Sequence, residues 1–231
     1  AMLRFFWTTW RGFLRQQITY RLHRQHWNCA VIAEPIEVVA GLSGRERQRA
    51  ALENAIWMSP PRGQFYADPF GSPLAGSGAI RLFFELFDWK TQRGEIATAM
   101  FDGRGFGPTT SALSAATHLS YPYVIEHEGS TFFVPEHAAA RDVSAFRVDS
   151  DGNAVEKTTI FPRSDLIDTT FVEWAGLLWA FATNDADVAN THLYLFYSDL
   201  AGTTWREHPL NPVKTNIRSA RPAGTPFVHE G

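Results

Sequence analysis

Tyr66-Ala67-Asp68-Pro69-Phe70 introduces an element that recurs along this chain. The later copies are Ser120-Tyr121-Pro122-Tyr123-Val124, Ile167-Asp168-Thr169-Thr170-Phe171 and Ala220-Arg221-Pro222-Ala223-Gly224. Their anchor residues, Asp68, Tyr121, Asp168 and Arg221, are 53, 47 and 53 residues apart (121−68, 168−121 and 221−168). A near-constant period of about 50 residues, built from short strands and turns, predicts the blades of a β-propeller.

Each copy opens a series of short strands joined by tight turns. We expect strands at 67–70, 80–87 and 95–101, then at 122–125, 131–134 and 143–148, and finally at 170–173, 177–183, 191–197 and 202–207. A fourth blade begins at Arg221 and stops at Gly231. The predicted fold class is therefore all-β: an incomplete propeller over residues 27–231, with about four blades begun in this chain. A partner domain or subunit would complete the ring, or residues 27–39 would supply a closing strand.

Residues 1–26 differ in character from the rest. They contain five arginines and no acidic residue, and their apolar side chains fall loosely at helical spacing. We expect a basic amphipathic helix, which would either contact an anionic membrane surface through residues 3–26 or pack against the propeller. Further on, we expect a strand at 29–32 and a loop or short helix at 44–54.

Composition excludes several classes of protein. The formal net charge of −3 gives no reason to expect a nucleic-acid partner. Cys29 is the single cysteine, so no intrachain disulfide can form. No apolar stretch has the 18 or more residues of a membrane span, and the eight histidines lack the spacing of metal ligands. We therefore expect no metal and no cofactor, and a cytoplasmic or membrane-peripheral location.

Four carboxylates are predicted to converge on one rim of the propeller. Asp68 and Asp168 begin innermost strands, whereas Glu85 and Glu136 end the strands that follow, 17 and 15 residues after their anchors. Because these two strands are antiparallel, the start of one lies beside the end of the other. Paired carboxyl groups are what the cleavage of a glycosidic bond requires, one as the acid and one as the base or nucleophile.

Other side chains near the repeats are candidates for binding a substrate. His118 and Arg221 flank or begin innermost strands, and a guanidinium there can clamp a carboxylate or phosphate or neutralise the carboxylates around it. The aromatic candidates for stacking on a sugar are Tyr66, Tyr121, Trp89 and Trp57; the alternative is that they fill the space between blades.

Together these motifs resemble a known family. The set comprises Phe65-Tyr66-Ala67-Asp68-Pro69-Phe70, Phe83-Phe84-Glu85, His118-Leu119-Ser120-Tyr121-Pro122-Tyr123, Pro135-Glu136, Ile167-Asp168 and Ala220-Arg221-Pro222-Ala223-Gly224. It resembles the N-terminal domain of the plant glucosamine inositolphosphorylceramide transferases and its bacterial relatives, over about residues 27–231. More distantly, it resembles the five-bladed propellers of glycosidase families 43 and 32. The resemblance implies five blades and a carbohydrate-active or carbohydrate-binding domain.

The resemblance to family 43 also implies roles for single residues. Asp68 matches the catalytic base, and Asp168 matches the aspartate that orients and tunes the acid. The general acid of that family opens the fourth blade, where this chain has Arg221. The acid would then be Glu136 or Glu85, or would be absent. We therefore expect a glycosidase-like enzyme acting on a furanoside or a microbial surface glycan. The alternatives are a non-catalytic glycan-binding module that supports a partner glycosyltransferase, and a glycosyltransferase built on a propeller.

Overall fold

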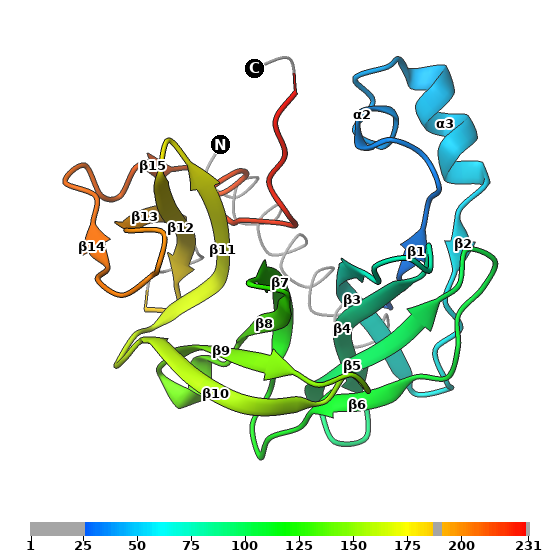
Figure 1. Ribbon diagram of the computed structural model, residues 1–231, viewed down its shortest axis with the longest axis horizontal. Coiled ribbons are helices and arrows are strands. Elements are labelled where there is room, and N and C mark those ends of the chain that lie inside the picture. The colour runs from blue at the N-terminus through cyan, green and yellow to red at the C-terminus, as the bar shows by residue number, and fades with distance from the viewer. Residues whose placement is uncertain (1–25, 187–190, 230–231) are drawn as a thin grey trace, which may run out of the picture.

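The computed structural model describes residues 26–186 and 191–229. The expected basic helix at 1–26 lies outside these residues, apart from His26. Three antiparallel sheets dominate the molecule and surround a common axis (Figure 1). We call them blades one, two and three in chain order.

Blade one has its four strands in sequence order from the axis outward. They are β3 (Gln64–Pro73), β4 (Ile80–Asp88), β5 (Arg93–Phe101) and β6 (Thr110–Leu113). The first three contain the expected strands at 67–70, 80–87 and 95–101, each somewhat longer than predicted. The fourth, β6, was not expected from the sequence, because it has only four residues and no alternation of polar and apolar side chains.

Blade two follows the same order. Its strands are β7 (Ser120–His127), β8 (Ser130–Glu136), β9 (Val143–Val148) and β10 (Ala154–Phe161), with a single 3-10 turn, η1 (Ala138–Ala140), between β8 and β9. The outer strand β10 was also not expected, since five successive exposed side chains give it little hydrophobic pattern.

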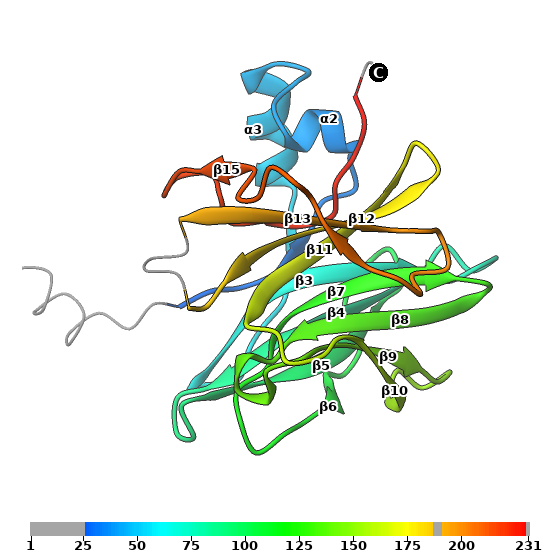
Figure 2. The ribbon, with the colours of Figure 1, turned by 90° about the vertical axis from the view of Figure 1, so that its left-hand side faces the viewer.

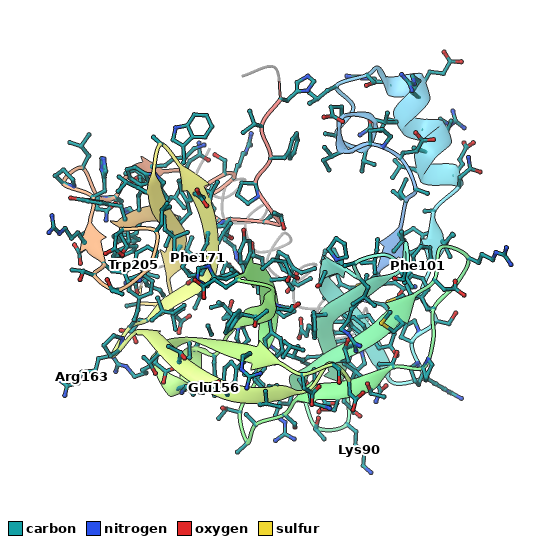
Figure 3. The ribbon with its side chains drawn as sticks, in the orientation of Figure 1. Lys90, Phe101, Glu156, Arg163, Phe171 and Trp205 are labelled. Carbon is teal, nitrogen blue, oxygen red and sulfur yellow. The ribbon has the colours of Figure 1, made fainter. Side chains whose placement is uncertain are left out.

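Blade three repeats this arrangement. Its strands are β11 (Leu166–Trp174), β12 (Leu177–Asn184), β13 (His192–Ser198) and β14 (Arg206–Glu207), and the short β15 (Lys214–Thr215) also pairs with β13. Phe171 and Trp205 lie side by side in this blade with ring centroids 5.7 Å apart (Figure 3). Both rings face the boundary with blade two, and Trp205 also contacts Phe161 of β10.

Alternating side chains of the second strands join one blade to the next. Phe83 of β4 packs against Phe133 of β8, with ring centroids 5.3 Å apart. The next residue of β8, Val134, belongs instead to the cluster shared with blade three, which includes Ala180 of β12. Because neighbouring residues of a strand face opposite sides of the sheet, blade two buries one face against blade one and the other against blade three.

The N-terminal part of the described chain lies beside blade one. The short strand β1 (Ala30–Val31) pairs with β2 (Ile56–Trp57), and between them lie the helices α2 (Ile36–Val39) and α3 (Arg45–Glu53). The helices lie on the same side of the molecule as the C-terminal segment, opposite β6 and β10 (Figure 2). The expected strand at 29–32 is thus only two residues long, and the polar stretch at 44–54 is a helix.

Two expectations about the closure of the ring are wrong for the described residues. Residues 27–39 do not add a strand to a blade, because β1 pairs with β2 and the chain enters α2 directly after Pro35. The fourth repeat does not form a strand either: from 216 to 229 the chain is irregular. Its motif, Arg221-Pro222-Ala223-Gly224, lies instead beside the innermost strands of blades two and three, where Arg221 contacts Asp168 of β11 and Gly224 contacts Tyr121 of β7. No helix among the described residues is long and apolar enough to span a membrane.

Candidate active site

The anchors Asp68, Tyr121 and Asp168 share a backbone conformation that most residues avoid. Their φ angles are 50°, 46° and 52°, in the left-handed region that costs roughly 1–2 kcal/mol for a residue with a Cβ. Each lies where the pairing between the innermost and second strands of its blade shifts in register. Such a bulge redirects a side chain, and all three side chains line one central cavity. The three repeats are therefore structurally equivalent at this position.

The cavity has a volume of about 670 Å³ and lies where the three innermost strands meet the C-terminal segment. Its walls combine carboxylates, aromatic rings and one guanidinium. The lining residues are Trp27, Asn28, Phe65, Ala67, Asp68, Pro69, Phe70, Glu85, Tyr121, Asp168, Arg221, Pro222, Ala223 and Gly224.

Arg221 binds Asp168 through two hydrogen bonds. Its Nη2 donates to Oδ1 at 3.0 Å and its Nε donates to Oδ2. The Asp168 side chain is 3% exposed, whereas that of Arg221 is 59% exposed. The pairing with Asp168 raises the pKa of Arg221 above its usual range, so the guanidinium remains charged. The residue that departs from the family 43 pattern is thus the partner of one of the predicted catalytic aspartates.

Glu85 and Glu136 occupy matching places in their blades. Glu85 pairs in register with Ala67, the residue before the first anchor, and Glu136 pairs with Ser120, the residue before the second. In blade three the same place belongs to Thr183, whose buried Oγ1 has no hydrogen-bond partner among the described residues. The prediction that carboxylates converge here agrees with the electrostatic coupling of Asp68 to Glu85, Glu136 and Asp168.

The carboxyl groups differ in their protonation. Burial, followed by the charge of Asp68, raises the pKa of Glu85 to about 8, so that Glu85 is protonated at neutral pH. Burial and the charge of Asp168 raise the pKa of Asp68, while Arg221 and the backbone N–H of Tyr121 act in the opposite direction. Burial, the charge of Asp168 and a hydrogen bond to Asp168 raise the pKa of Glu136. Glu136 therefore keeps its proton, and its O–H donates a hydrogen bond to Asp168.

Tyr121 lines the cavity and also holds the C-terminal segment. Its hydroxyl lies 2.7 Å from Thr170 Oγ1 and accepts a hydrogen bond from the Gly224 N–H at 3.1 Å. Burial raises its pKa to about 12, so it stays a neutral hydroxyl.

Besides Glu136, three predicted site residues do not line the cavity. Tyr66 is 3% exposed and packs against Phe84 in the core, because in a strand it faces away from its neighbour Phe65. Trp89 contacts the edges of Phe87 and Phe65 just beyond the end of β4. His118 lies behind the cavity wall, with its Nε2 3.5 Å from Glu85 Oε1.

The sequence did not indicate Trp27, Asn28 or Phe65 as site residues. Trp27 is 58% exposed and Phe65 is buried, and both rings contribute to the wall. Phe65 is adjacent to the first repeat, and this position could have indicated that it belongs to the site. Trp27 is far from the repeats in the sequence, and only the folding of the chain brings it to the cavity. Within 26–186 and 191–229, no three His, Cys, Asp or Glu side chains are grouped so that they could hold a metal ion.

Residues 55–231 match the family described as glucosamine inositolphosphorylceramide transferase 1, N-terminal. The chain belongs to this family. A full-length relative, glucosamine inositolphosphorylceramide transferase 1 of Oryza sativa subsp. japonica, is 30% identical over 174 residues, which are 72% of this chain and 23% of the relative. The protein of the same name in Arabidopsis thaliana is 28% identical over 174 residues, 72% of this chain and 22% of the relative. The chain thus spans about a quarter of the length of these relatives.

Solved structures of glycoside hydrolases resemble this member of the family in fold. Zg3597, a family 117 glycoside hydrolase of Zobellia galactanivorans, has a TM-score of 0.52 and 15% identity, covering 69% of this chain and 60% of that one. The exo-β-1,3-galactanase of Phanerochaete chrysosporium with galactose has a TM-score of 0.54 and 10% identity over 67% and 39%. A GH43 β-1,3-galactosidase has a TM-score of 0.57 and 7% identity over 70% and 36%. The predicted fold class, all-β and of the five-bladed propeller type, is confirmed.

Proposed function

We propose that this domain cleaves or transfers a glycosidic bond in the central cavity, with Asp68 as base or nucleophile and Glu85 as acid. The observation that carries the proposal is that two neighbouring carboxyl groups, those of Asp68 and Glu85, lie on one cavity wall in different environments. Burial raises the pKa of both groups, to about 8 for Glu85, but at Asp68 the charge of Arg221 and the backbone N–H of Tyr121 act against this rise. A carboxyl group that keeps its proton beside one whose ionised form has such partners is suited to act as the acid for that base.

Glu136, expected from the sequence to be the acid, is less suited to that role. It is not among the residues that line the cavity, and its O–H donates a hydrogen bond to Asp168. We assign Glu136, Asp168 and Arg221 to a supporting cluster. Their ion pair and hydrogen bond keep these side chains, and therefore their charges, in fixed positions next to the substrate.

The substrate class follows from the cavity walls. A volume of about 670 Å³ falls within the range of small-molecule sites, roughly 300–1,000 Å³. Aromatic rings such as Trp27 and Phe65 provide apolar faces against which a sugar ring can pack. We propose a furanoside or a terminal residue of a surface glycan as the substrate. Relatives that are named as transferases, and neighbours that are named as glycoside hydrolases, both support a carbohydrate.

One observation favours a second candidate, a glycan-binding module without catalysis. Arg221 occupies the place of the family 43 acid, and its charge is neutralised by Asp168. The same ion pair disfavours the third alternative, a transferase in which Arg221 binds a donor phosphate, because the guanidinium is already engaged.

The test uses aryl glycosides and oligosaccharides with the unaltered chain and with Asp68→Asn, Glu85→Gln and Glu136→Gln. We expect Asp68→Asn and Glu85→Gln each to lower turnover by about 10²–10⁴-fold, and Glu136→Gln to lower it less. Aryl glycosides with acidic phenol leaving groups need no proton donor, so they should restore turnover by Glu85→Gln but not by Asp68→Asn. Glu173→Gln, an exposed carboxyl on β11, is the control. Binding that survives Asp68→Asn, with no turnover by any form, would identify a binding module.

A further inference from the structure

Gly94 of β5 lies so close to Glu85 and His118 that no residue with a Cβ could take its place. Its carbonyl accepts the Leu119 N–H at 3.0 Å, and its own N–H donates to His118 Nδ1 at 2.8 Å. A Cβ at this position would lie 2.5 Å from the Leu119 carbonyl oxygen, 2.7 Å from Glu85 Oε1 and 2.8 Å from His118 Cε1. Because the nearest of these atoms belongs to the backbone, a side chain could not be accommodated by a change of rotamer.

The Gly94 N–H also fixes the tautomer of His118. A ring nitrogen that accepts a hydrogen bond carries no proton, so the proton of the neutral imidazole is on Nε2. That nitrogen is the one that lies 3.5 Å from Glu85 Oε1. Burial lowers the pKa of His118, and the occupied Nδ1 opposes a second proton. The ring also contacts the edge of Phe87, with centroids 6.0 Å apart, which restricts its rotation.

Two other titratable groups near Glu85 are weaker candidates than His118 for donating a hydrogen bond to its carboxyl group. Asp68 of β3 and Cys29, which precedes β1, both interact electrostatically with Glu85. Asp68 in its ionised form only accepts hydrogen bonds, and burial raises the pKa of Cys29 to about 12, which leaves a weak thiol donor. The His118 imidazole is therefore the strong neutral donor beside this carboxyl.

We propose that His118 is a positioning residue for Glu85: held as the Nε2–H tautomer by Gly94, it donates to Oε1 and leaves Oε2 as the oxygen that carries the transferable proton. The separation of 3.5 Å exceeds that of a formed hydrogen bond, about 2.7–3.2 Å, so the proposal requires that thermal motion of the Glu85 carboxyl group brings the two atoms within hydrogen-bonding distance in the free chain. This inference rests on the proposed function, in which Glu85 is the acid. It deepens that function by assigning the residue that determines which oxygen donates.

The first experiment is a long-range ¹H–¹⁵N correlation spectrum of the histidine rings in the whole chain, with His118 identified by its loss in His118→Phe. We expect the pattern of a single neutral Nε2–H tautomer at pH 6 to 9. The matched glycine variants are Gly94→Ala, which should abolish that pattern, and Gly105→Ala, where a Cβ meets no atom within 4 Å and the pattern should persist. A Nδ1–H tautomer, or a mixture of tautomers, in the unaltered chain would overturn the proposal.

The second experiment follows the carboxyl carbon of Glu85 by ¹³C NMR, assigned through Glu85→Gln. A donated hydrogen bond favours the ionised carboxylate, so His118→Phe should raise the midpoint of the Glu85 titration by about half a pH unit or more. His127→Gln, a change at an exposed histidine, should leave it unchanged. An unchanged midpoint in folded His118→Phe would contradict positioning by His118. If His118→Phe does not fold, His118→Asn serves in the titration and the tautomer decides independently.

These readouts separate the two claims. If Glu85→Gln retains full glycan turnover, the proposed function fails, whereas the tautomer and the titration still determine whether His118 positions Glu85. If turnover depends on Glu85 but His118→Phe leaves both the midpoint of Glu85 and turnover unchanged, the function stands and the positioning role fails.

Discussion

At the scale of single residues, the centre of this domain is characterised by buried carboxyl groups that keep their protons at neutral pH. Glu85 is 7% exposed and Asp168 is 2% exposed, yet only Asp168 has a cation bound to it. Because an ionised carboxylate without a partner is costly to bury, Glu85 remains protonated. One fold thus holds a carboxyl group paired with a guanidinium and a protonated carboxyl group within the same small volume.

The raised pKa of Glu85 makes the stability of the fold depend on pH. Folded Glu85 keeps its proton up to about pH 8, whereas an unfolded glutamate releases it near pH 4.3. Between these values the folded state binds more protons, so its stability falls as pH rises. We expect the free energy of unfolding to decrease from pH 5.5 to 7.5 by on the order of 2 kcal/mol more in the unaltered chain than in Glu85→Gln.

Urea unfolding at several pH values measures this difference. The comparison between the two forms cancels groups that act oppositely, such as His137, whose pKa burial lowers. Glu173→Gln should show the pH dependence of the unaltered chain. Equal slopes for the unaltered chain and Glu85→Gln would mean that Glu85 titrates normally.

At the scale of single elements, two-residue turns define the hairpins that face the axis. In blade two, Glu128 and Gly129 connect His127 to its partner Ser130; in blade three, Ala175 and Gly176 connect Trp174 to Leu177. All four turn residues have positive φ, between 48° and 76°, as a tight hairpin with a right-handed twist requires. Glycine adopts this conformation freely, but alanine and glutamate do not.

The turn at Ala175 is therefore open to improvement. Asparagine tolerates the left-handed region better than alanine. We expect Ala175→Asn to raise the free energy of unfolding by about 0.5–1 kcal/mol, and the β-branched change Ala175→Val to lower it. Guanidinium chloride unfolding would reveal both effects as opposite shifts of the midpoint with an unchanged slope. A lower midpoint for Ala175→Asn would show that the turn is not the strained element.

At the scale of the whole molecule, the C-terminal segment connects two blades across the axis. Arg221 binds Asp168 of blade three, and the Gly224 N–H donates to Tyr121 of blade two. The segment thus forms a wall of the cavity, and its guanidinium also neutralises the buried Asp168 carboxylate.

Removal of the guanidinium should reveal this connection. Arg221→Met leaves the buried Asp168 carboxylate without its cation. The cost of an unpaired buried charge is discounted here because water can reach the half-exposed site, so we expect a loss of about 2 kcal/mol. Adding Asp168→Asn should recover part of that loss, since no buried charge then remains. Chemical unfolding of both single variants and the double variant measures the coupling.

Arg218→Met, at an exposed arginine of the same segment, is the control and should change stability by less than about 0.5 kcal/mol. Strictly additive losses in the double variant would show that the ion pair contributes nothing to the fold.

Much of the architecture could be predicted from the sequence because it depends on local rules. Alternating hydrophobic residues, glycine turns and the repeated anchors place the inner strands of three blades correctly. The outer strands β6 and β10 escaped prediction because exposed strands carry little hydrophobic pattern. The fourth copy of the motif, at Arg221, matches the others in spacing but not in structure, since no strand forms there to create the bulge shared by Asp68, Tyr121 and Asp168.

The class of fold, the equivalence of the first three repeats and the prediction that four carboxylates meet at the axis all follow from the amino-acid sequence. The packed structure was needed to show that Phe65 rather than Tyr66 faces the cavity, that Arg221 neutralises Asp168, and that Glu85 keeps its proton beside His118. The reason is physical: turns and strand periodicity are set by neighbours in the chain, whereas burial, charge pairing and pKa depend on residues that meet only after distant strands have packed.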